Sequence, residues 1–308
     1  MKSKYNSSQK KFNWKTILIT VLIFSSTFTL LDAFLIPKAY AVVNQDQLEN
    51  STQSSLLIDE DAQIDPLKTN NSYIDNNISI NIEKVDKNGV VFYVADVEIS
   101  DVSFLKTAFA YDTFGKNITE TTSEMAEDHD AIFAINGDYY GFRDIGLVIR
   151  NGVLYRDISG GPLGDQSLII DSEGDLQIVD TDEISGTSLI ESGILQGFTF
   201  GPVLVEEGKA SAEYNTTISL KANPRTAIGQ ISPLHYIFIV VEGRSKTSVG
   251  MMLEQLAQEF IDRGATVAYN LDGGGSSAMV LNGILINTPA EKRNTGERNI
   301  SDIIYIGY

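Results

Sequence analysis

The stretch AYNLDGGGSSAMV at residues 268–280 has the residue types and spacing of a chemical site, because an apolar run typical of a buried strand ends there at a carboxylate. Asp272 stands at the end of this predicted strand. Without Cβ atoms, Gly273–Gly275 can turn their amide hydrogens inward, a geometry that holds anions. Ser276 and Ser277 add hydroxyl donors. The same pattern fits an ordinary glycine-rich hairpin turn, and it matches no Walker or dinucleotide-binding motif.

A second glycine-marked corner, AINGDYYGFR at residues 134–143, follows another apolar strand. It brings Asn136, Asp138, Tyr139 and Arg143 into eight residues. Aromatic rings beside amide and carboxylate groups suit a sugar, which offers an apolar face and a hydroxyl edge. The alternative is a β-turn whose tyrosines pack on the domain.

Three arginines follow turn residues: Arg225, Arg244 and Arg298. If they converge on one phosphate, their planar guanidinium groups can bind it in bidentate fashion. In a chain this acidic, each could instead be a surface arginine paired with a carboxylate, worth about 0–1 kcal/mol. We interpret His129 and His235 as structural.

The composition limits the chemistry that these residues can perform. Among 308 residues, 41 acidic and 23 basic side chains give a net charge of −18, which repels nucleic acid backbones. There is no cysteine and there are two histidines, so disulfides, a thiolate nucleophile and multi-histidine metal centres are excluded. Carboxylates, arginines, hydroxyls, amides and backbone must therefore carry any reaction.

The elements that position these residues begin at residue 78, and their short alternating runs predict strands. The predicted strands are 78–82, 90–99, 131–135, 146–150, 153–156, 167–170, 199–205, 226–230, 236–241, 266–271, 278–281 and 303–306. We predict a polar, solvent-facing helix over 119–129 and a helix over 249–263 with one apolar stripe. The expected fold class is α+β: a strand-rich mixed sheet with a few packed helices.

The N-terminal part divides into three segments before the domain at 78–308. Residues 1–16 form a basic tail with five lysines and no acid, and 17–36 are mostly apolar. This pattern predicts either a single-pass membrane anchor with an extracellular domain, or a signal peptide cleaved after Ala41. Residues 37–77 form an acidic polar spacer, with one short helix possible around 53–58.

Seven segments taken together resemble the phosphodiester glycosidase family, whose bacterial relatives are often labelled exopolysaccharide-biosynthesis proteins. The resemblance covers about residues 78–308 and is strongest from 130 onward. Its carriers are AINGDYYG at 134–141, RNGVLYR at 150–156, FGPVLVEEG at 200–208, NPRTAIG at 223–229, VVEGR at 240–244, NLDGGGSSAMVLNG at 270–283 and ERNISDIIYI at 297–306.

The resemblance implies an extracytoplasmic hydrolase that releases a sugar, an N-acetylhexosamine, from a sugar-1-phosphodiester in cell-wall or exopolysaccharide material. It implies an active site made of Asn136, Arg225, Thr226, Glu242, Arg244, Asn270, Asp272, Gly273, Gly274, Ser276 and Arg298. The chain departs from the family at two positions. Asp138 stands where the family often has glycine, and Gln255 stands where we expect glutamate, so we interpret Gln255 as structural.

The expected chemistry follows from the substrate that the resemblance implies. A phosphate monoester is already a good leaving group, so the site must mainly stabilise charge and activate water or supply a nucleophile. We expect the three arginines and the amides of Gly273 and Gly274 to bind the phosphate. Asp272 or Glu242 would act as base or as stabiliser of the oxocarbenium-like centre.

Asn136, Asn270 and Tyr139 would orient the sugar hydroxyls. The spacing of the acidic residues in the sequence does not require a metal. A divalent cation would find hard oxygen ligands in Asp138 and Asp272. Two other functions stay open: a non-catalytic module that binds an anionic cell-surface glycopolymer, and a metal-dependent phosphodiesterase that cuts the P–O bond.

Overall fold

A computed structural model of the protein describes residues 14–40, 65–161, 165–211, 221–290 and 296–308. The chain divides into two compact units, Met1–Pro37 and Lys38–Tyr308. The short helix predicted around 53–58 lies outside the described residues.

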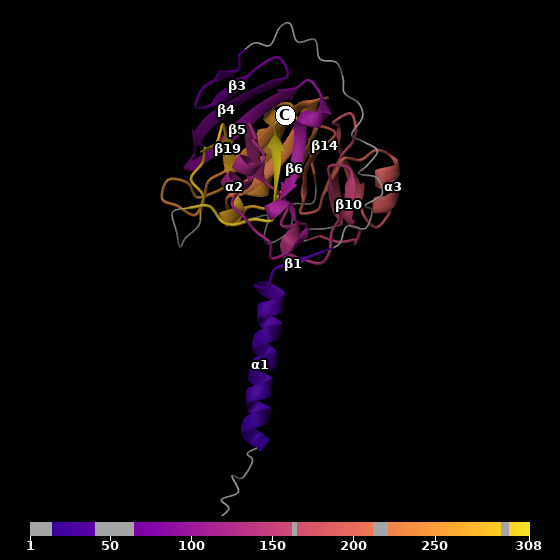
Figure 1. Cartoon of the computed structure of the whole chain (residues 1–308). Coiled ribbons are helices and arrows are strands. Elements are labelled where there is room, and N and C mark those ends of the chain that lie inside the picture. Colours follow the sequence, from indigo (N-terminus) through magenta and orange to yellow (C-terminus); the bar gives the residue numbers. More distant parts are fainter. Residues whose placement is uncertain (1–13, 41–64, 162–164, 212–220, 291–295) are drawn as a thin grey trace, which may run out of the picture. The chain divides into compact units, whose positions relative to one another are not determined.

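The first unit contains the helix α1 (Trp14–Phe34), which is coloured indigo in Figure 1. It has neither glycine nor proline in its 21 residues, and Pro37 follows shortly after its end. Hydroxyl groups inside it bond back to the preceding turn, as Ser26 Oγ does to Leu22 O at 2.8 Å. Among the described helices, α1 included, none is long and apolar enough to cross a membrane. The predicted membrane anchor is therefore not supported.

The second unit is strand-rich (Figure 1), and its largest sheet has nine strands in the order β15-β14-β18-β16-β17-β5-β4-β3-β2. Its strands are β2 (Leu67–Lys68), β3 (Ser72–Ile74), β4 (Ile78–Lys87), β5 (Val90–Ile99), β14 (Val203–Glu206), β15 (Lys209–Ala210), β16 (Arg225–Ser232), β17 (His235–Val241) and β18 (Val267–Asn270).

Two five-stranded sheets and a two-stranded pair complete the unit. One five-stranded sheet has the order β20-β19-β8-β21-β6, the other β10-β9-β13-β11-β12, and β1 pairs with β7. Their strands are β1 (Lys38–Ala39), β6 (Leu105–Phe109), β7 (Gly115–Lys116), β8 (Phe133–Asn136), β9 (Val148–Arg150), β10 (Val153–Arg156), β11 (Gln166–Ile170), β12 (Leu176–Asp180), β13 (Gln196–Phe198), β19 (Met279–Leu281), β20 (Ile284–Leu285) and β21 (Asp302–Ile306).

The main core lies between the nine-stranded sheet and the two smaller ones. Phe238 of β17, Ile304 of β21 and Phe198 of β13 belong to the same buried cluster. Side chains alternate between the faces of a strand, so neighbouring residues serve different cores. In β16, Ile228 enters this cluster, whereas Ala227 enters a second one on the opposite face.

The helix α4 (Leu253–Asp262) covers that opposite face of the nine-stranded sheet. The predicted apolar stripe is confirmed, because Leu253, Leu256, Ala257 and Phe260 are all buried. A Cβ on Gly229 of β16 would lie 2.7 Å from the Phe260 ring, so glycine is what lets the helix approach the sheet this closely.

The start of α4 differs from the prediction, which placed it at residue 249. Met251 instead pairs with Asn223 as an extended bridge, and Gly250 has a φ of 96°. The helix begins where Gln255 Oε1 accepts a hydrogen bond of 3.0 Å from the Met252 amide. Gln255 therefore caps a helix, which agrees with its interpretation as structural.

The helix α2 (Thr122–Asp128) corrects the prediction of a solvent-facing helix. Met125 and Ala126 are buried with residues of β8, β19 and β21. Thr121 and Glu124 form a capping box at its start. A third helix, α3 (Gly186–Glu191), buries Leu189 against the sheet that contains β9 and β11.

The α+β, strand-rich class is confirmed, but the prediction of a mixed sheet is wrong. Every ladder between the described strands is antiparallel. Antiparallel neighbours can be joined by short turns, and Asn88-Gly89, with φ of 56° and 74°, is the turn between β4 and β5.

Candidate active site

The site forms where β8 and β18, from different sheets, end against each other. The Asp272 amide donates to Gly137 O at 3.2 Å, and Asn136 Nδ2 donates to Asp272 O at 2.7 Å. A Cβ on Gly137 would lie 2.3 Å from the Asp302 carboxylate, so the close approach of Asp302 to this corner requires glycine. The two glycine-marked corners that the sequence singles out separately are thus parts of one site.

Two of the predicted site residues, Asn136 and Thr226, stabilise this junction of β8 and β18 from the buried side. Thr226 Oγ1 donates to Asn136 Oδ1 at 2.7 Å, and the Ala278 amide donates to the same oxygen at 3.2 Å. Both Asn136 and Thr226 are completely buried. Their hydrogen bonds tie β8 and β16 to the segment after the glycines, which favours a supporting role over contact with a sugar.

Asn270 has a similar position beneath the site. It is 1% exposed, and its Nδ2 donates to Gly201 O at 2.7 Å. It therefore holds the end of β18 against the segment that leads into β14. This burial favours a supporting role for Asn270 over contact with a sugar.

Asp272 is the half-buried carboxylate of the site. Its Oδ1 accepts a hydrogen bond of 2.9 Å from the Gly273 amide. Burial raises the pKa of Asp272 to about 6, although the Ser276 hydroxyl, the charges of Arg298 and Arg143, and the Gly273 amide all act to lower it. A carboxylate with this pKa is largely charged at neutral pH and can still exchange a proton.

Two of the three predicted arginines lie against the glycine turn. A Cβ on Gly274 would be 3.0 Å from Arg244 Nη2, and one on Gly275 would be 2.5 Å from Arg298 Nη2. Arg244 also donates from Nη2 to Asn223 Oδ1 at 3.2 Å. Both arginine side chains are exposed, so they can meet a ligand that approaches Asp272.

Arg225 lies behind the turn rather than in the open site. It is 6% exposed and donates from Nε to Met251 O at 3.1 Å and from Nη2 to Lys221 O at 2.9 Å. Burial and the neighbouring charge of Arg244 lower the pKa of Arg225 to about 10, so it stays charged at neutral pH. Its backbone supports the turn, since a Cβ on Gly273 would lie 3.4 Å from Arg225 Cα.

The glycine amides that we expected to bind phosphate already have partners. The Gly273 amide donates to the Asp272 carboxylate at 2.9 Å, and the Gly274 amide donates to Pro224 O at 2.9 Å. The glycines therefore serve close packing, with Gly274 at a φ of 68°. The binding of an anion falls to the arginines.

Glu242 lies at the end of β17 and is 8% exposed. Its Oε1 accepts a hydrogen bond of 2.7 Å from the Thr288 amide. Burial raises the pKa of Tyr93, and the negative charge of Glu242 raises it further. Among the described residues, no hydrogen bond or ion pair joins Glu242 to Asp272. Asp272 is therefore the carboxylate that the geometry favours for chemistry.

Asp138 is completely buried and holds other groups in place. It accepts hydrogen bonds from the Tyr140 and Thr199 amides at 3.1 and 2.9 Å, and Arg150 Nη2 lies 3.2 Å away. Tyr139 differs, because it is 39% exposed and its ring stacks on Phe142 at 4.7 Å. Tyr139 is thus the residue of this corner that can meet a sugar face.

A small cavity of about 10 Å³ lies against Asp272 and Tyr139 and is also lined by Ser301. This is about the volume that one water molecule requires. A larger pocket of about 530 Å³ is lined by residues of the β4–β5 turn and α4, among them Lys87 and Gln258. None of the predicted site residues lines that larger pocket, so the chemistry of the site does not lie there.

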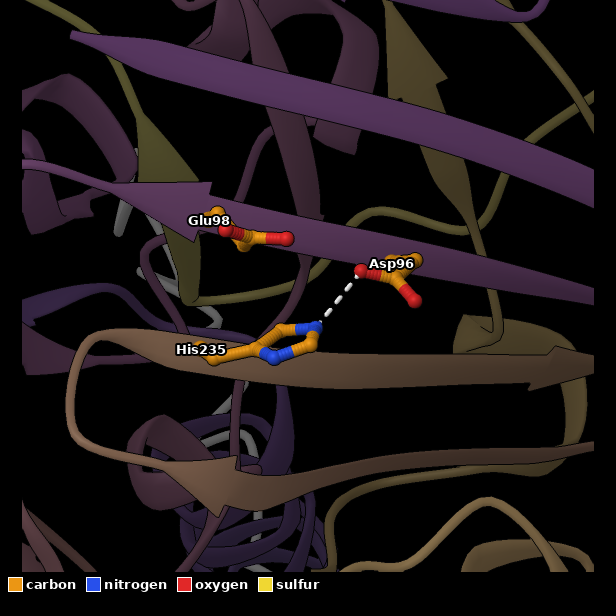
Figure 2. Close-up of side chains that lie close together, drawn as sticks. All are labelled: Asp96, Glu98 and His235. Atoms are coloured by element: carbon orange, nitrogen blue, oxygen red, sulfur yellow. Dashed lines mark hydrogen bonds and ion pairs between the residues drawn. The ribbon is translucent and has the colours of Figure 1, made fainter.

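The predicted oxygen ligands Asp138 and Asp272 do not form a group with metal-ligand spacing among the described residues. The one such group found there consists of Asp96, Glu98 and His235, with ligand atoms within 4.8 Å of one another. Figure 2 shows these side chains on β5 and β17, with His235 Nε2 2.8 Å from Asp96 Oδ1. Exposed acids beside a histidine need no ion, and this group shares no residue with the site.

The sequence analysis missed the role of Arg143. This residue lies in the predicted corner at 134–143, but the sequence motifs assigned it no function. In the structure its side chain is 9% exposed and it acts on the charge of Asp272. Its position three residues after a glycine–carboxylate–tyrosine turn is the signal that could have identified it.

The family comparison identifies the family to which the chain belongs. Glycosidase hydrolases that act on phosphodiester-linked sugars are described by the phosphodiester glycosidase model, and this model matches residues 129–307, more than half of the chain. The chain belongs to the phosphodiester glycosidase family. The resemblance that the sequence motifs carried is confirmed.

Two curated relatives match part of the chain. The SPbeta prophage-derived uncharacterized protein YomE of Bacillus subtilis is 31% identical over 242 residues, 71% of this chain and 37% of YomE. The N-acetylglucosamine-1-phosphodiester alpha-N-acetylglucosaminidase of Bos taurus is 26% identical over 188 residues, 56% of this chain and 35% of that protein. The chain therefore spans about a third of the length of the curated relatives it matches.

A solved structure has a similar fold. The catalytic domain of the zebrafish N-acetylglucosamine-1-phosphodiester alpha-N-acetylglucosaminidase superposes with a TM-score of 0.59 at 22% identity, covering 75% of this chain and 83% of that one. At this level of identity the likeness shows the fold alone.

Proposed function

We propose that this chain is an extracytoplasmic hydrolase that releases an N-acetylhexosamine from a sugar-1-phosphodiester in cell-wall or exopolysaccharide material. The observation that carries this proposal is the half-buried Asp272, which lies beside the exposed Arg298 and next to the turn on which Arg244 packs. Family membership and the name of the bovine relative support the choice of linkage and sugar.

The roles proposed for the site residues follow from their charges. A phosphodiester carries a negative charge, and the exposed guanidinium groups of Arg244 and Arg298 can hold it by charge-assisted hydrogen bonds. These bonds strengthen as negative charge develops on the departing phosphate, so they favour the transition state over the ground state. The leaving group needs little protonation, and this fits a site with a single half-buried carboxylate.

Asp272 would act at the anomeric carbon. Because its pKa is about 6, its charged form predominates at neutral pH and can stabilise an oxocarbenium-like centre or take a proton from water. The water-sized cavity against Asp272 offers a place for that water. The ring of Tyr139, which is 39% exposed, would pack on the sugar.

The N-terminal sequence supports export of the domain from the cytoplasm. Five lysines without an acid precede the apolar residues 17–36, and Ala39-Tyr40-Ala41 has the small-x-small form of a signal-peptidase site. The predicted acidic spacer at 37–77 would then lie between the apolar segment and the domain.

The proposal is tested by separating binding from turnover in the full-length chain. Asp272→Asn should reduce the release of sugar from an α-linked N-acetylhexosamine 1-phosphodiester by at least a thousandfold, with substrate affinity changed by only a few fold. Asp86→Asn, on the exposed part of β4, is the matched control and should keep full activity. A wild-type chain that binds the substrate without releasing sugar would instead be a non-catalytic glycan-binding module.

A further inference from the structure

The guanidinium group of Arg143 is buried and only partly satisfied. Its side chain is 9% exposed, its Nη2 donates to Thr199 O, and the same nitrogen lies 3.5 Å from Asp138 Oδ2. Within the described part of the chain, its Nε and Nη1 are buried without a hydrogen-bond partner. Buried donors that lack a partner cost about 1–3 kcal/mol each, so such a group in a native fold calls for an explanation.

The charges around Arg143 do not balance. Arg150 Nη2 lies 2.7 Å from Asp302 Oδ2 and 3.2 Å from Asp138 Oδ1, so it takes up most of the charge of both carboxylates. Arg156 adds a third guanidinium, whose Nη1 donates to Arg143 O at 2.7 Å. Three largely buried arginines thus share two buried aspartates, to which the exposed Asp144 and the half-buried Asp272 add smaller contributions. An additional anion at the unpaired end of Arg143 would balance this cluster.

That unpaired charge acts on the candidate active site. Arg143 and Arg298 both lower the pKa of Tyr139 and of Asp272, although burial raises both values overall. Tyr139 therefore lies near all three charged groups. It also has a φ of 70°, a left-handed conformation that is strained for a residue with a bulky side chain.

We propose that Arg143 is an oxyanion-binding residue of this site, and that one of these two buried donors, Nε or Nη1, donates a hydrogen bond to an oxygen of the phosphate group of the substrate. This inference rests on the proposed function. Nε and Nη1 point to different sides of the planar group, so each of these donors can meet a single anionic oxygen through a charge-assisted hydrogen bond.

Arg143 then differs in role from Arg244 and Arg298. The two exposed arginines attract the phosphodiester from solvent, where water and salt screen their charge. Arg143 is held in place by Asp138 and Thr199 and is shielded from water, so its bonds to an anion are stronger and its orientation is fixed.

The experiment measures the binding of inorganic phosphate to the full-length chain by calorimetry. Arg143→Gln should raise the dissociation constant of phosphate at least tenfold. Arg143→Lys, which keeps the charge but loses the planar guanidinium donors, should raise it at least threefold. Arg263→Gln is the matched control, because Arg263 lies at the end of α4 in an ion pair of 2.6 Å with Glu259, and it should change the constant less than twofold.

The outcomes separate this inference from the proposed function. Phosphate binding that is equally tight in the wild type, Arg143→Gln and Arg143→Lys would overturn the inference, and so would a wild type that binds no phosphate. If circular dichroism shows that Arg143→Gln does not fold, the comparison with Arg143→Lys decides. A wild type that binds phosphate through Arg143 but never releases sugar would refute the proposed function alone.

Discussion

The charge of Asp272 should cost the folded protein stability, and the cost should depend on pH. The pKa of this carboxyl is raised from 3.8 to about 6. One pKa unit corresponds to about 1.4 kcal/mol, so charging Asp272 at pH 7.5 costs the fold up to about 3 kcal/mol relative to the unfolded chain. Asp272→Asn keeps the shape of the side chain and removes this cost. We therefore expect the variant to be inactive and more stable than the parent at pH 7.5.

The sign of the pH dependence follows from the direction of the pKa change. Between about pH 4 and pH 6 the folded chain holds a proton on Asp272 that the unfolded chain has lost, so this residue lowers stability as pH rises through that window. At pH 4.5 the cost is about 1 kcal/mol. The advantage of Asp272→Asn should thus grow by up to about 2 kcal/mol between pH 4.5 and pH 7.5, less what solvent screens at this partly exposed group.

The assay is urea unfolding of the full-length chain, parent and variant, at both pH values. Circular dichroism is the suitable probe, because the single tryptophan of the sequence is Trp14, in α1 and outside the domain. Asp86→Asn on β4 controls for the loss of an exposed carboxylate. The reasoning fails if Asp272→Asn is less stable than the parent at pH 7.5, or if the difference is the same at both pH values.

Three further outcomes are expected. Because Asp272 must be charged to act, sugar release should fall at pH 5 to about a tenth of its neutral plateau, and a flat profile between pH 5 and 7 would exclude this carboxylate as the titrating group. Arg244→Gln should raise KM roughly tenfold or more through the loss of a charge-assisted bond to phosphate, and an unchanged KM in steady-state assays would show that Arg244 does not contact it. Met125→Ala should lower the free energy of unfolding by about 2–5 kcal/mol, because this side chain is completely buried. Glu127→Ala, on the exposed face of α2, should change it little. Similar effects of the two substitutions in urea unfolding would contradict the packing of α2.

Much of the strand pattern could be predicted, because half-buried strands alternate in sequence as they do in the fold. β10 matches its predicted residues, and β5 was found in full. Residues 119–129 are mostly polar, so the sequence did not predict that α2 packs on the domain. Met125 and Ala126 are the apolar residues on its buried side. Turns such as Asn88-Gly89 indicate antiparallel hairpins, but local patterns carry no information on which distant strands pair, so the order of strands in the sheets could not be derived from them.

The two segments that form the site could be located from the sequence. The extent to which each of their side chains is buried could not. Asn136 and Asn270 lie after apolar strands, as residues at the edge of a site do, yet both are buried by contacts with distant segments. Arg225 and Arg244 have similar neighbours in sequence. They differ because β16 and the Arg244 loop direct their side chains to different surroundings, and only tertiary structure determines that.

The central claim is that the chain breaks the bond between the anomeric carbon and the phosphate oxygen. The most direct measurement is to incubate the full-length chain in ¹⁸O-labelled water with α-linked N-acetylhexosamine 1-phosphodiesters and to weigh the products by mass spectrometry. We predict label on the reducing sugar and unlabelled phosphate monoester. Label on the phosphate would contradict the claim, because it would show that the protein cuts the P–O bond as a phosphodiesterase.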